Sequence, residues 1–359
     1  MPTGRMTDTI TAIILERHGG PEVLKVAQRP APRARPGHVV VQIHACAVNR
    51  LDIWVRGGLP NLRLDYPHVL GSDIAGVVRE VGEGVDAALV GTEVVVNPGR
   101  SCGRCEACLS GWDNLCPDYH ILGESCAGGY CEQLEVPAVN LVPKPARLTM
   151  VEAAAFPLTF LTAWQMLVVR GRIEPGETVL LHAAGSGVGS AGLQIAKLHG
   201  ARVIALASTD AKLDKARELG ADACVRSSDD DWPKQVRALA GVGRKGVDLV
   251  FEHVGQATWE HSIKLCRRGG RVVTCGASSG WDARTDLRHV FFRQIQILGS
   301  TMGSKASMFR IAELIDAGEL SPVVDKVFPL AEAAQAHRYL DRREQFGKVV
   351  LDIAGVAAQ

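Results

Sequence analysis

Four cysteines are spaced closely enough to hold one metal ion. In the run from Ser101 to Cys116, the residues Cys102, Cys105, Cys108 and Cys116 are separated by two, two and seven residues. Four thiolates at this spacing can surround one Zn²⁺ ion as a tetrahedron. Because all four ligands are sulfur, no position is left for water or substrate. We therefore expect a structural zinc that holds a loop, and the catalytic chemistry must lie elsewhere.

Disulfides and an iron–sulfur cluster are the alternative readings of these cysteines. We find no secretory signal, and most of the other cysteines lie in apolar or strand-like stretches. Cys116 is followed by Pro117 as in an iron–sulfur motif, but the seven-residue gap differs from the ferredoxin run. The chain's ten cysteines favour a reducing, cytoplasmic compartment.

Length and composition narrow the class of protein. The chain has 359 residues, of which 47% are apolar, and a net charge of +1. This length predicts two domains, and the composition is ample for burying a core in each. The near-zero charge indicates no nucleic-acid partner, and no apolar run is long enough to suggest a membrane span. We expect a small-molecule substrate.

The N-terminal part, residues 8–150, is β-rich and punctuated by glycine and proline. Short strands are expected at 39–43, 76–82 and 92–96. This pattern predicts a partly closed β-barrel with the zinc lobe, about residues 98–120, as an insertion. Residues 1–7 are set apart as a short extension.

Strands and helices alternate from residue 151 to about 290. Apolar strands between amphipathic helices predict an α/β domain with a doubly wound parallel sheet. Residues 291–359 are expected to add the last strand of this sheet and then a separate C-terminal segment. The expected strands are 178–182, 202–206, 247–251, 270–274 and 348–353, and the expected helices are 188–198, 210–219, 307–316 and 330–340.

A glycine-rich loop joins the strand 178–182 to the helix 188–198. Its residues are Gly185, Ser186, Gly187, Val188 and Gly189, preceded by Ala183 and Ala184. Glycines let the backbone approach a pyrophosphate, and the following helix presents free N–H groups to the anion. Although Ala184 and Ser186 occupy the first two glycine positions of the dinucleotide fingerprint, the strand–loop–helix setting favours a dinucleotide over a plain turn.

The end of the next strand indicates which dinucleotide is bound. An acid about 20 residues after the loop would hold the ribose hydroxyls of NAD. That place holds Ala207, Ser208 and Thr209, and Lys212 follows. A hydroxyl and a cation suit a 2′-phosphate, so NADP(H) is favoured. Asp210 argues against NADP(H), because its carboxylate could turn inward and select NAD.

These motifs together resemble the zinc-type medium-chain dehydrogenase/reductase superfamily, including its quinone oxidoreductase-like branch. The resemblance extends over nearly the whole chain and includes the segments 48–52, 70–76 and 160–164. It implies a GroES-like barrel, a Rossmann domain and a C-terminal segment that returns to the barrel. It also implies an active site in the cleft between domains, and a homodimer or homotetramer.

The sequence departs from the alcohol dehydrogenases of this superfamily at their catalytic zinc. The cysteine position aligns with Asn49, the histidine–glutamate pair with Ser72 and Asp73, and the third ligand with Leu158. An amide, a hydroxyl and an isobutyl group do not make a zinc site. The alternative ligand set is Cys46, Asp52 and Asp73. The quinone oxidoreductase-like branch has the same Asn-x-x-Asp pattern and needs no catalytic metal.

Without a catalytic metal, conjugate reduction is the favoured reaction. Hydride adds to the β-carbon of an enone or to a quinone, and preorganised donors stabilise the charge on oxygen. Asn49 is the expected donor, with a buried tie between two loops as the alternative. Asp52 is expected to orient neighbouring backbone. Ser72 and Asp73 line the former metal position, where a structural role is equally open.

The resemblance also assigns residues to the cofactor. Thr162 resembles the residue that packs by the nicotinamide ring, and Lys348 aligns with a basic residue near the pyrophosphate. For Lys348 the alternative is a solvated cation at a strand end. Backbone contacts to the cofactor are implied for Val254, Cys275, Gly276, Ala277, Ser300, Thr301 and Met302.

Two other functions remain open from the sequence. One is a zinc-dependent alcohol dehydrogenase with atypical ligands, which would contain two zinc ions per chain. The other is a non-catalytic NADPH-binding protein, because a tyrosine often found in the pocket of the quinone oxidoreductase-like branch is not evident in residues 56–60.

Overall fold

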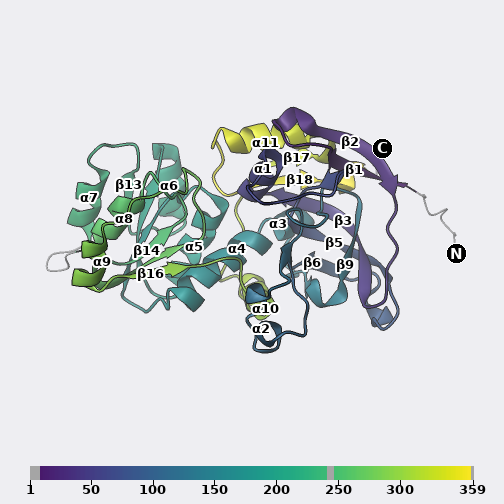
Figure 1. The fold of residues 1–359 in the computed structure, drawn as a ribbon, viewed down its shortest axis with the longest axis horizontal. Helices are drawn as coiled ribbons and strands as arrows, with labels where there is room; N and C mark the ends of the chain where they lie inside the picture. The colour runs from purple at the N-terminus through teal and green to yellow at the C-terminus, as the bar shows by residue number, and fades with distance from the viewer. Residues whose placement is uncertain (1–8, 241–245, 357–359) are drawn as a thin grey trace. The chain divides into compact units, whose positions relative to one another are not determined.

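A computed structural model describes residues 9–240 and 246–356 of the chain (Figure 1). It divides into two compact units. The first comprises residues up to 158, 308–318 and 324 onward, and the second comprises 159–307 and 319–323. The extension at residues 1–7 lies outside the described residues. No described helix combines the length and apolar character needed to cross a membrane.

The first unit is built on β-sheets, and several of its strands, among them β3 and β5, are mostly buried. A three-stranded sheet has the order β2 (Leu24–Pro30), β1 (Thr9–Leu15), β4 (His68–Val69). A seven-stranded sheet has the order β10 (Leu141–Pro143), β6 (Glu93–Val96), β5 (Asp73–Val81), β3 (His38–Val48), β18 (Lys348–Asp352), β17 (Val324–Pro329), with β9 (Gln133–Pro137) also paired to β3. The inward faces of these strands share one apolar core.

The last strand of the chain, β18, occupies an interior place in that sheet. It pairs antiparallel with β3, so that Val349 lies opposite Val48, and parallel with β17. This pairing brings the C-terminal segment back to the first unit. Short elements complete the unit: β7 (Gly99–Arg100), β8 (His120–Ile121), α1 (Arg50–Gly57), α2 (Glu106–Leu109), α3 (Met150–Ala154), α11 (Ala333–Asp341) and the part of α10 (Lys305–Asp316) from residue 308 on.

The second unit contains a six-stranded sheet in which every pair of neighbouring strands is parallel. Its order is β13 (Ala223–Arg226), β12 (Arg202–Ala207), β11 (Thr178–Leu181), β14 (Val247–Glu252), β15 (Cys266–Thr274), β16 (Gln296–Gly299). The helices are α4 (Pro157–Trp164, in this unit from residue 159), the π-helix Gln165–Arg170, α5 (Gly187–Leu198), α6 (Asp210–Glu218), α7 (Trp232–Leu239), α8 (Trp259–Leu265) and α9 (Leu287–Arg293). The order reverses at β11, as in dinucleotide-binding sheets.

The predicted fold class, a GroES-like barrel with a Rossmann domain, is confirmed. The pattern of the sequence did not predict the helices α1, α7 and α8 or the strand β13. It did predict most strands of the parallel sheet. The described strand β15 also begins at Cys266, earlier than the expected residue 270.

Candidate functional site

Four cysteine sulfurs converge in the lobe around α2. The Sγ atoms of Cys102, Cys105, Cys108 and Cys116 all lie within 4.8 Å of one another. The pairs Cys105–Cys108 and Cys102–Cys108 are 3.5 and 3.9 Å apart. These values bracket the roughly 3.8 Å that Zn–S bonds of about 2.3 Å give in a tetrahedron. Backbone N–H groups of Arg104 and Cys105 lower the pKa of Cys102 to about 6, whereas, against the backbone N–H of Cys108, burial and the neighbouring thiols raise the pKa of Cys105 to about 11. The cluster therefore fits a closed structural zinc site.

A second polar cluster, which we call the Asn49 cluster, joins Asn49, Asp73 and Lys348 inside the first unit. The Lys348 ammonium donates to Asn49 Oδ1 at 2.6 Å and to Asp73 Oδ2 at 2.7 Å. Asn49 Nδ2 donates to the same carboxylate oxygen at 2.9 Å. The side chains of Lys348 and Asp73 are 4% and 0% exposed. A buried ion pair of this kind depends on such additional hydrogen bonds.

The contacts of the cluster fix the orientation of the Asn49 amide. An ammonium can only donate, so the atom facing Lys348 must be the amide oxygen. One N–H of Nδ2 is used on Asp73, and the second N–H remains for another acceptor. Asp73 Oδ1 in turn accepts from the backbone N–H of Leu158 at 2.6 Å. Asn49, Asp73 and the backbone of Leu158, at the positions where the resemblance predicts zinc ligands, are thus linked around Lys348.

Asp52 holds the backbone beside this cluster. It lies in the first turn of α1, and its carboxylate accepts from Asn49 N at 2.7 Å and from Gly71 N at 2.9 Å. Gly71 has φ +100°, and a Cβ there would lie 2.4 Å from the Tyr130 ring. Burial raises the pKa of Asp52 to about 6, and the two backbone N–H groups oppose that rise. The geometry fits the predicted role of orienting backbone.

The remaining two residues predicted to be catalytic occupy separate places. Ser72 is fully buried and donates its hydroxyl to Leu122 O at 2.7 Å. Its only proton is therefore used on backbone. Thr162 lies on α4 in the second unit and is nearly buried. Their catalytic roles stay predictions.

The glycine-rich loop has the geometry of a helix-capping turn. Ala183 takes a positive φ of 48° directly after β11. Ser186 caps α5, because its Oγ accepts from Gly189 N at 2.9 Å. A Cβ on Gly189 would lie 2.3 Å from Ala183 O, so no larger residue fits. The first N–H groups of α5 have no partner within the helix and can meet an anion.

Comparison with known proteins identifies the family. Residues 35–146 match the alcohol dehydrogenase GroES-like domain, and residues 187–317 match the zinc-binding dehydrogenase domain. A crotonyl-CoA carboxylase/reductase of Cereibacter sphaeroides is 32% identical, over 93% of this chain and 84% of the relative. The quinone oxidoreductase of Mus musculus is 28% identical, over 98% and 99%. A crystal structure of an NAD-dependent alcohol dehydrogenase is 52% identical, with a TM-score of 0.92 over 96% and 99% of the two chains.

The chain belongs to the medium-chain dehydrogenase/reductase superfamily. It is therefore an oxidoreductase of a family that binds NAD or NADP, and its relatives include quinone and crotonyl-CoA reductases.

In this superfamily member, the residues predicted to contact the cofactor follow the ends of parallel strands. The carboxyl ends of parallel strands lie on one edge of a sheet, where such sheets bind nucleotides. The glycine-rich loop follows β11, Ser208 follows β12, and Val254 follows β14. The segments 275–277 and 300–302 follow β15 and β16 in the same way. Lys348 is the exception, because it lies in the first unit and contacts Asn49 and Asp73. Its cofactor role stays a prediction.

The turn after β14 is held by a buried carboxylate that the sequence analysis did not single out. Glu252 accepts from Val254 N at 2.7 Å, from Gly255 N at 3.1 Å and from Ser262 Oγ at 2.5 Å. Burial alone would raise the pKa of Glu252, but His182, Ser262 and these backbone groups outweigh burial and lower it. Ser262 is fully buried and His182 contacts its hydroxyl at 2.9 Å. This serine–histidine–glutamate set positions backbone and offers no accessible nucleophile.

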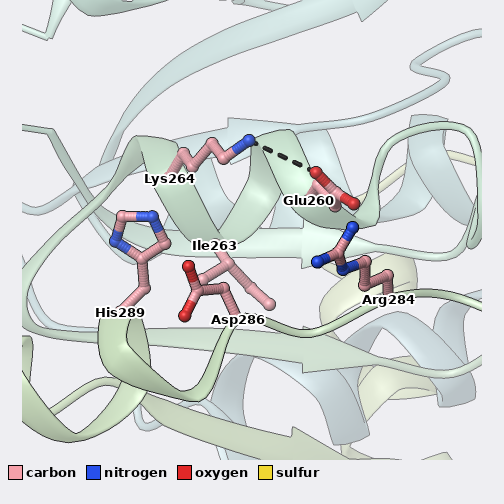
Figure 2. A pocket seen from close by; sticks show the side chains of 6 residues that line it. All are labelled: Glu260, Ile263, Lys264, Arg284, Asp286 and His289. Carbon is pink, nitrogen blue, oxygen red and sulfur yellow. Dashed lines mark hydrogen bonds and ion pairs between the residues drawn. The ribbon is translucent and has the colours of Figure 1, made fainter.

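A cavity of about 220 Å³ lies beside α8 and α9 (Figure 2). Glu260 and Asp286 face Lys264 and Arg284 around Ile263, with His289 at one side. Lys264 Nζ forms an ion pair with Glu260 at 3.2 Å. Charges of both signs meet here, and no predicted site residue lines the cavity. We assign it no part in the oxidoreductase site.

Sequence reasoning also missed Tyr130, His337 and Arg56, which form a buried line of hydrogen bonds next to Asp52. Tyr130 and His337 are 207 residues apart in the chain and 3.1 Å apart between Oη and Nε2. No local spacing could have linked them. Their surroundings gave no signal either, because His337 is followed by Arg338 and lies near Gln335 and Asp341.

Proposed function

We propose that this protein reduces an activated carbon–carbon double bond or a quinone with NADPH, without a catalytic metal. The observation that carries the proposal is the Asn49 cluster. A lysine ammonium lies between Asn49 and Asp73, where the resemblance places metal ligands. A divalent cation at this position would meet an existing positive charge and a single carboxylate, which is a poor zinc site.

Asn49 is the proposed donor to the substrate. When bound, NADPH supplies the hydride that adds to the β-carbon or to the quinone ring. The electron pair of the former double bond then moves to the carbonyl oxygen. The free N–H of Asn49 Nδ2 stabilises that oxyanion, while Lys348 and Asp73 keep the amide from turning. A proton from solvent completes the product.

The choice of NADPH rests on the residues after β12 and β13. Asp210, the acid that would favour NAD, forms an ion pair with Arg226 at the end of β13. Thr209 caps α6 and places Lys212 in its first turn. Ser208 and Lys212, which follow β12, offer a hydroxyl and a cation, which suit a 2′-phosphate.

NAD-dependent alcohol oxidation is the second candidate. The 52% identical structure, which is described as an NAD-dependent alcohol dehydrogenase, favours it. Such a reaction requires removal of the alcohol proton, which zinc performs by lowering the alcohol pKa. The two candidates therefore differ in cofactor, in substrate and in metal content, with two zinc ions per chain expected for the alcohol dehydrogenase.

The test is a substrate screen on metal-analysed protein. NADPH and NADH oxidation would be followed with crotonyl-CoA, an enone and a quinone, and NAD⁺ reduction with primary and secondary alcohols. We expect one zinc per chain and turnover with NADPH. Alcohol oxidation with NAD⁺ as the dominant activity, or no NADPH oxidation with any acceptor, would overturn the proposal. The second outcome would favour a non-catalytic binding protein.

A pair of asparagine variants tests the role of Asn49. Asn49→Ala should lower kcat about 100-fold, the usual cost of removing an oxyanion donor. Asn140→Ala is the matched control, because Asn140 is also a buried amide and donates only to backbone oxygens, Asn97 O and Gly99 O. The control should lower stability and leave kcat of the folded protein unchanged. Equal effects on kcat would assign Asn49 a purely structural role.

We further propose a homodimer or homotetramer in a reducing, cytoplasmic compartment. Helix α9 exposes Leu287, Phe291 and Phe292 near the edge strand β16. Exposed apolar groups next to an unpaired edge are typical of a subunit contact. The ten cysteines are all free thiols, which fits a reducing compartment. Light scattering on Phe292→Glu and wild-type protein would test the assembly.

A further inference from the structure

The strand order of the parallel sheet reverses where β11 and β14 lie side by side. In sheets of this kind a dinucleotide lies across such a reversal, at the carboxyl ends of the strands. His182 directly follows β11 and leads into the glycine-rich loop, and Glu252 is the last residue of β14. Residues 253–255, which we call the β14 turn, come next. The glycine-rich loop and the β14 turn therefore begin at neighbouring positions on the two sides of the reversal.

The buried Glu252 carboxylate holds the β14 turn with one oxygen and α8 with the other. Its Oε1 accepts from Val254 N at 2.7 Å and from Gly255 N at 3.1 Å. Its Oε2 accepts from Ser262 Oγ, on α8, at 2.5 Å. Thr258 Oγ1, at the start of α8, lies 3.0 and 2.9 Å from the two oxygens. The backbone of the turn is thus tied to the helix that follows it.

His182 connects this carboxylate to the glycine-rich loop. Its Nε2 lies 2.9 Å from Ser262 Oγ, and its backbone oxygen lies 2.9 Å from His253 Nε2. His182, Ser262 and Glu252 are at most 1% exposed. The next residue, Ala183, is the one with the positive φ of 48° at the start of the loop. Both the side chain and the carbonyl group of His182 are therefore held by residues at or after the end of β14.

The acceptors in this network fix the positions of its protons. A carbonyl oxygen only accepts, so His253 carries a proton on Nε2 and donates it to His182 O. An ionised carboxylate also only accepts, so the Ser262 hydroxyl donates to Glu252. The Ser262 oxygen then accepts from His182, which must carry its proton on Nε2 as well. Burial lowers the pKa of both histidines, which favours the neutral rings.

We propose that Glu252, Ser262 and His182 are positioning residues for the nucleotide: with His253 they lock the β14 turn to the start of the glycine-rich loop, so that the two segments form one preformed cradle. Such preorganisation raises affinity, because the segments need not be ordered when the ligand binds. The inference goes beyond the proposed reaction, since it concerns binding of either nucleotide and involves no substrate.

The first experiment compares two buried carboxylates at opposite ends of β14. Glu252→Leu removes the acceptor that holds the β14 turn. It should raise Kd about tenfold for both NADPH and NADH, because the two nucleotides share the pyrophosphate and the nicotinamide. Asp248→Leu is the matched control, because Asp248 is 4% exposed and accepts from Thr178 N at the amino end of the strand. The control should lower stability and leave both Kd values unchanged. Calorimetric titration of the folded proteins measures Kd.

Kinetics add a second readout for the same variants. In Glu252→Leu, KM for the nucleotide should rise while kcat at saturating nucleotide changes little, because no reacting group is removed. Unchanged Kd values in this variant would overturn the inference. Equal losses of affinity in Glu252→Leu and Asp248→Leu would also overturn it, since a general loss of stability would then explain both. The expected Kd values together with an absence of turnover in wild type would support the inference and count only against the proposed reaction.

Glu252→Gln keeps the test open if Glu252→Leu does not fold. The Val254 and Gly255 N–H groups should hold the new amide oxygen at the place of Oε1, so that the amide nitrogen takes the place of Oε2 and donates to Ser262. The Ser262 proton then turns to His182 Nε2, and the proton of the histidine moves to Nδ1. Because the acceptor of the turn is kept, both Kd values should stay within about threefold of wild type.

NMR of nitrogen-labelled histidine detects this change of tautomer, with the His182 signal identified by its loss in His182→Asn. We expect the Nε2–H form of His182 in wild type and the Nδ1–H form in Glu252→Gln. An Nδ1–H form in wild type, or the same form in both proteins, would contradict the network that joins Glu252 to His182.

Discussion

The four-cysteine cluster and the Asn49 cluster lie in the same unit but differ in the positive charge that they contain. The Asn49 cluster includes a lysine ammonium, whereas the cysteine cluster has no cationic side chain among its four residues. The cysteine lobe gathers four soft sulfur atoms within 4.8 Å of one another, an arrangement that fits a metal ion. The Asn49 cluster is buried and already contains its cation, the Lys348 ammonium, bound to Asp73 and Asn49. The difference teaches that the residue types decide what a polar cluster suits: four thiols fit a metal ion, whereas a carboxylate and an amide here bind a lysine.

The largest expected effect is loss of metal from the cysteine lobe. Cys108→Ser should lower zinc content from one per chain to near zero after dialysis against a chelator, because structural zinc sites gain about 10–16 kcal/mol only with all ligands present. Cys224→Ser, a half-buried cysteine outside the cluster, should keep its zinc. Lys348→Met should also keep one zinc. Metal analysis of the three variants and of wild type is the measurement. Two zinc ions per chain in wild type would mean that the Asn49 cluster also binds a metal, contrary to the expectation.

The next effect is expected on removing the cation of the Asn49 cluster. Lys348→Met leaves the fully buried Asp73 unpaired and should lower the free energy of unfolding by about 3–5 kcal/mol. The control is Lys197→Met, which breaks the half-exposed pair with Asp222 and should cost about 0–1 kcal/mol. Urea unfolding measures both, and similar losses would mean that burial of the pair has no special cost. Adding Asp73→Leu to Lys348→Met should recover much of the stability.

A smaller effect on stability is expected from pH, through the titration of the buried groups His337 and Asp52. The folded pKa of His337, about 3, lies below its usual 6.5, so the folded state binds fewer protons and its stability falls as pH drops below 6.5. At pH 5 this loss is about 2 kcal/mol. Asp52 acts in the opposite sense, because its folded pKa of about 6 exceeds the usual 3.8 and stability rises as pH falls through that window.

His337→Gln removes one of these two opposing titrations. Relative to wild type, the variant should gain about 2 kcal/mol of stability on going from pH 7 to pH 5. Urea midpoints at the two pH values measure the change. An identical pH dependence in variant and wild type would show that His337 is not held neutral in the folded state.

The smallest effect is expected at the nucleotide-binding end of the second unit. Lys212→Ala should raise KM for NADPH about tenfold, the equivalent of roughly 1.4 kcal/mol, and leave KM for NADH unchanged. Lys215→Ala, on the same helix but exposed, is the control and should change neither value. Equal effects of Lys212→Ala on both cofactors would show that Lys212 does not read the 2′-phosphate.

The sequence predicted those features that local spacing determines. The cysteine spacing predicted that the four thiols converge, and the strand–glycine–helix order predicted the turn capped by Ser186. Apolar runs predicted most strands of the parallel sheet because buried strands have a continuous hydrophobic signature. The short helix α1 was missed, since its eight residues carry little periodic signal and its start depends on the Asn49–Asp52 cap.

Features that depend on distant partners could not be predicted from the sequence. The interpretation of Lys348 as a cofactor residue followed from its alignment, whereas its contacts with Asn49 and Asp73 span 299 and 275 residues. The same holds for Tyr130 and His337. Nothing near these residues in the sequence indicates the partner. For Lys348, the sheet pairing of β18 with β3 is what brings it to Asn49.

The interior place of β18 also has a consequence for synthesis on the ribosome. Strand β3 cannot gain its neighbour on that side until residues 348–352 have emerged, whereas the parallel sheet of the second unit is complete once β16 has been made. Pairing across so long a stretch of chain is slow to form. The nascent polypeptide should therefore finish its later-encoded nucleotide-binding half first. Until β18 has joined the sheet, the Asp73 carboxylate has no ion pair with Lys348.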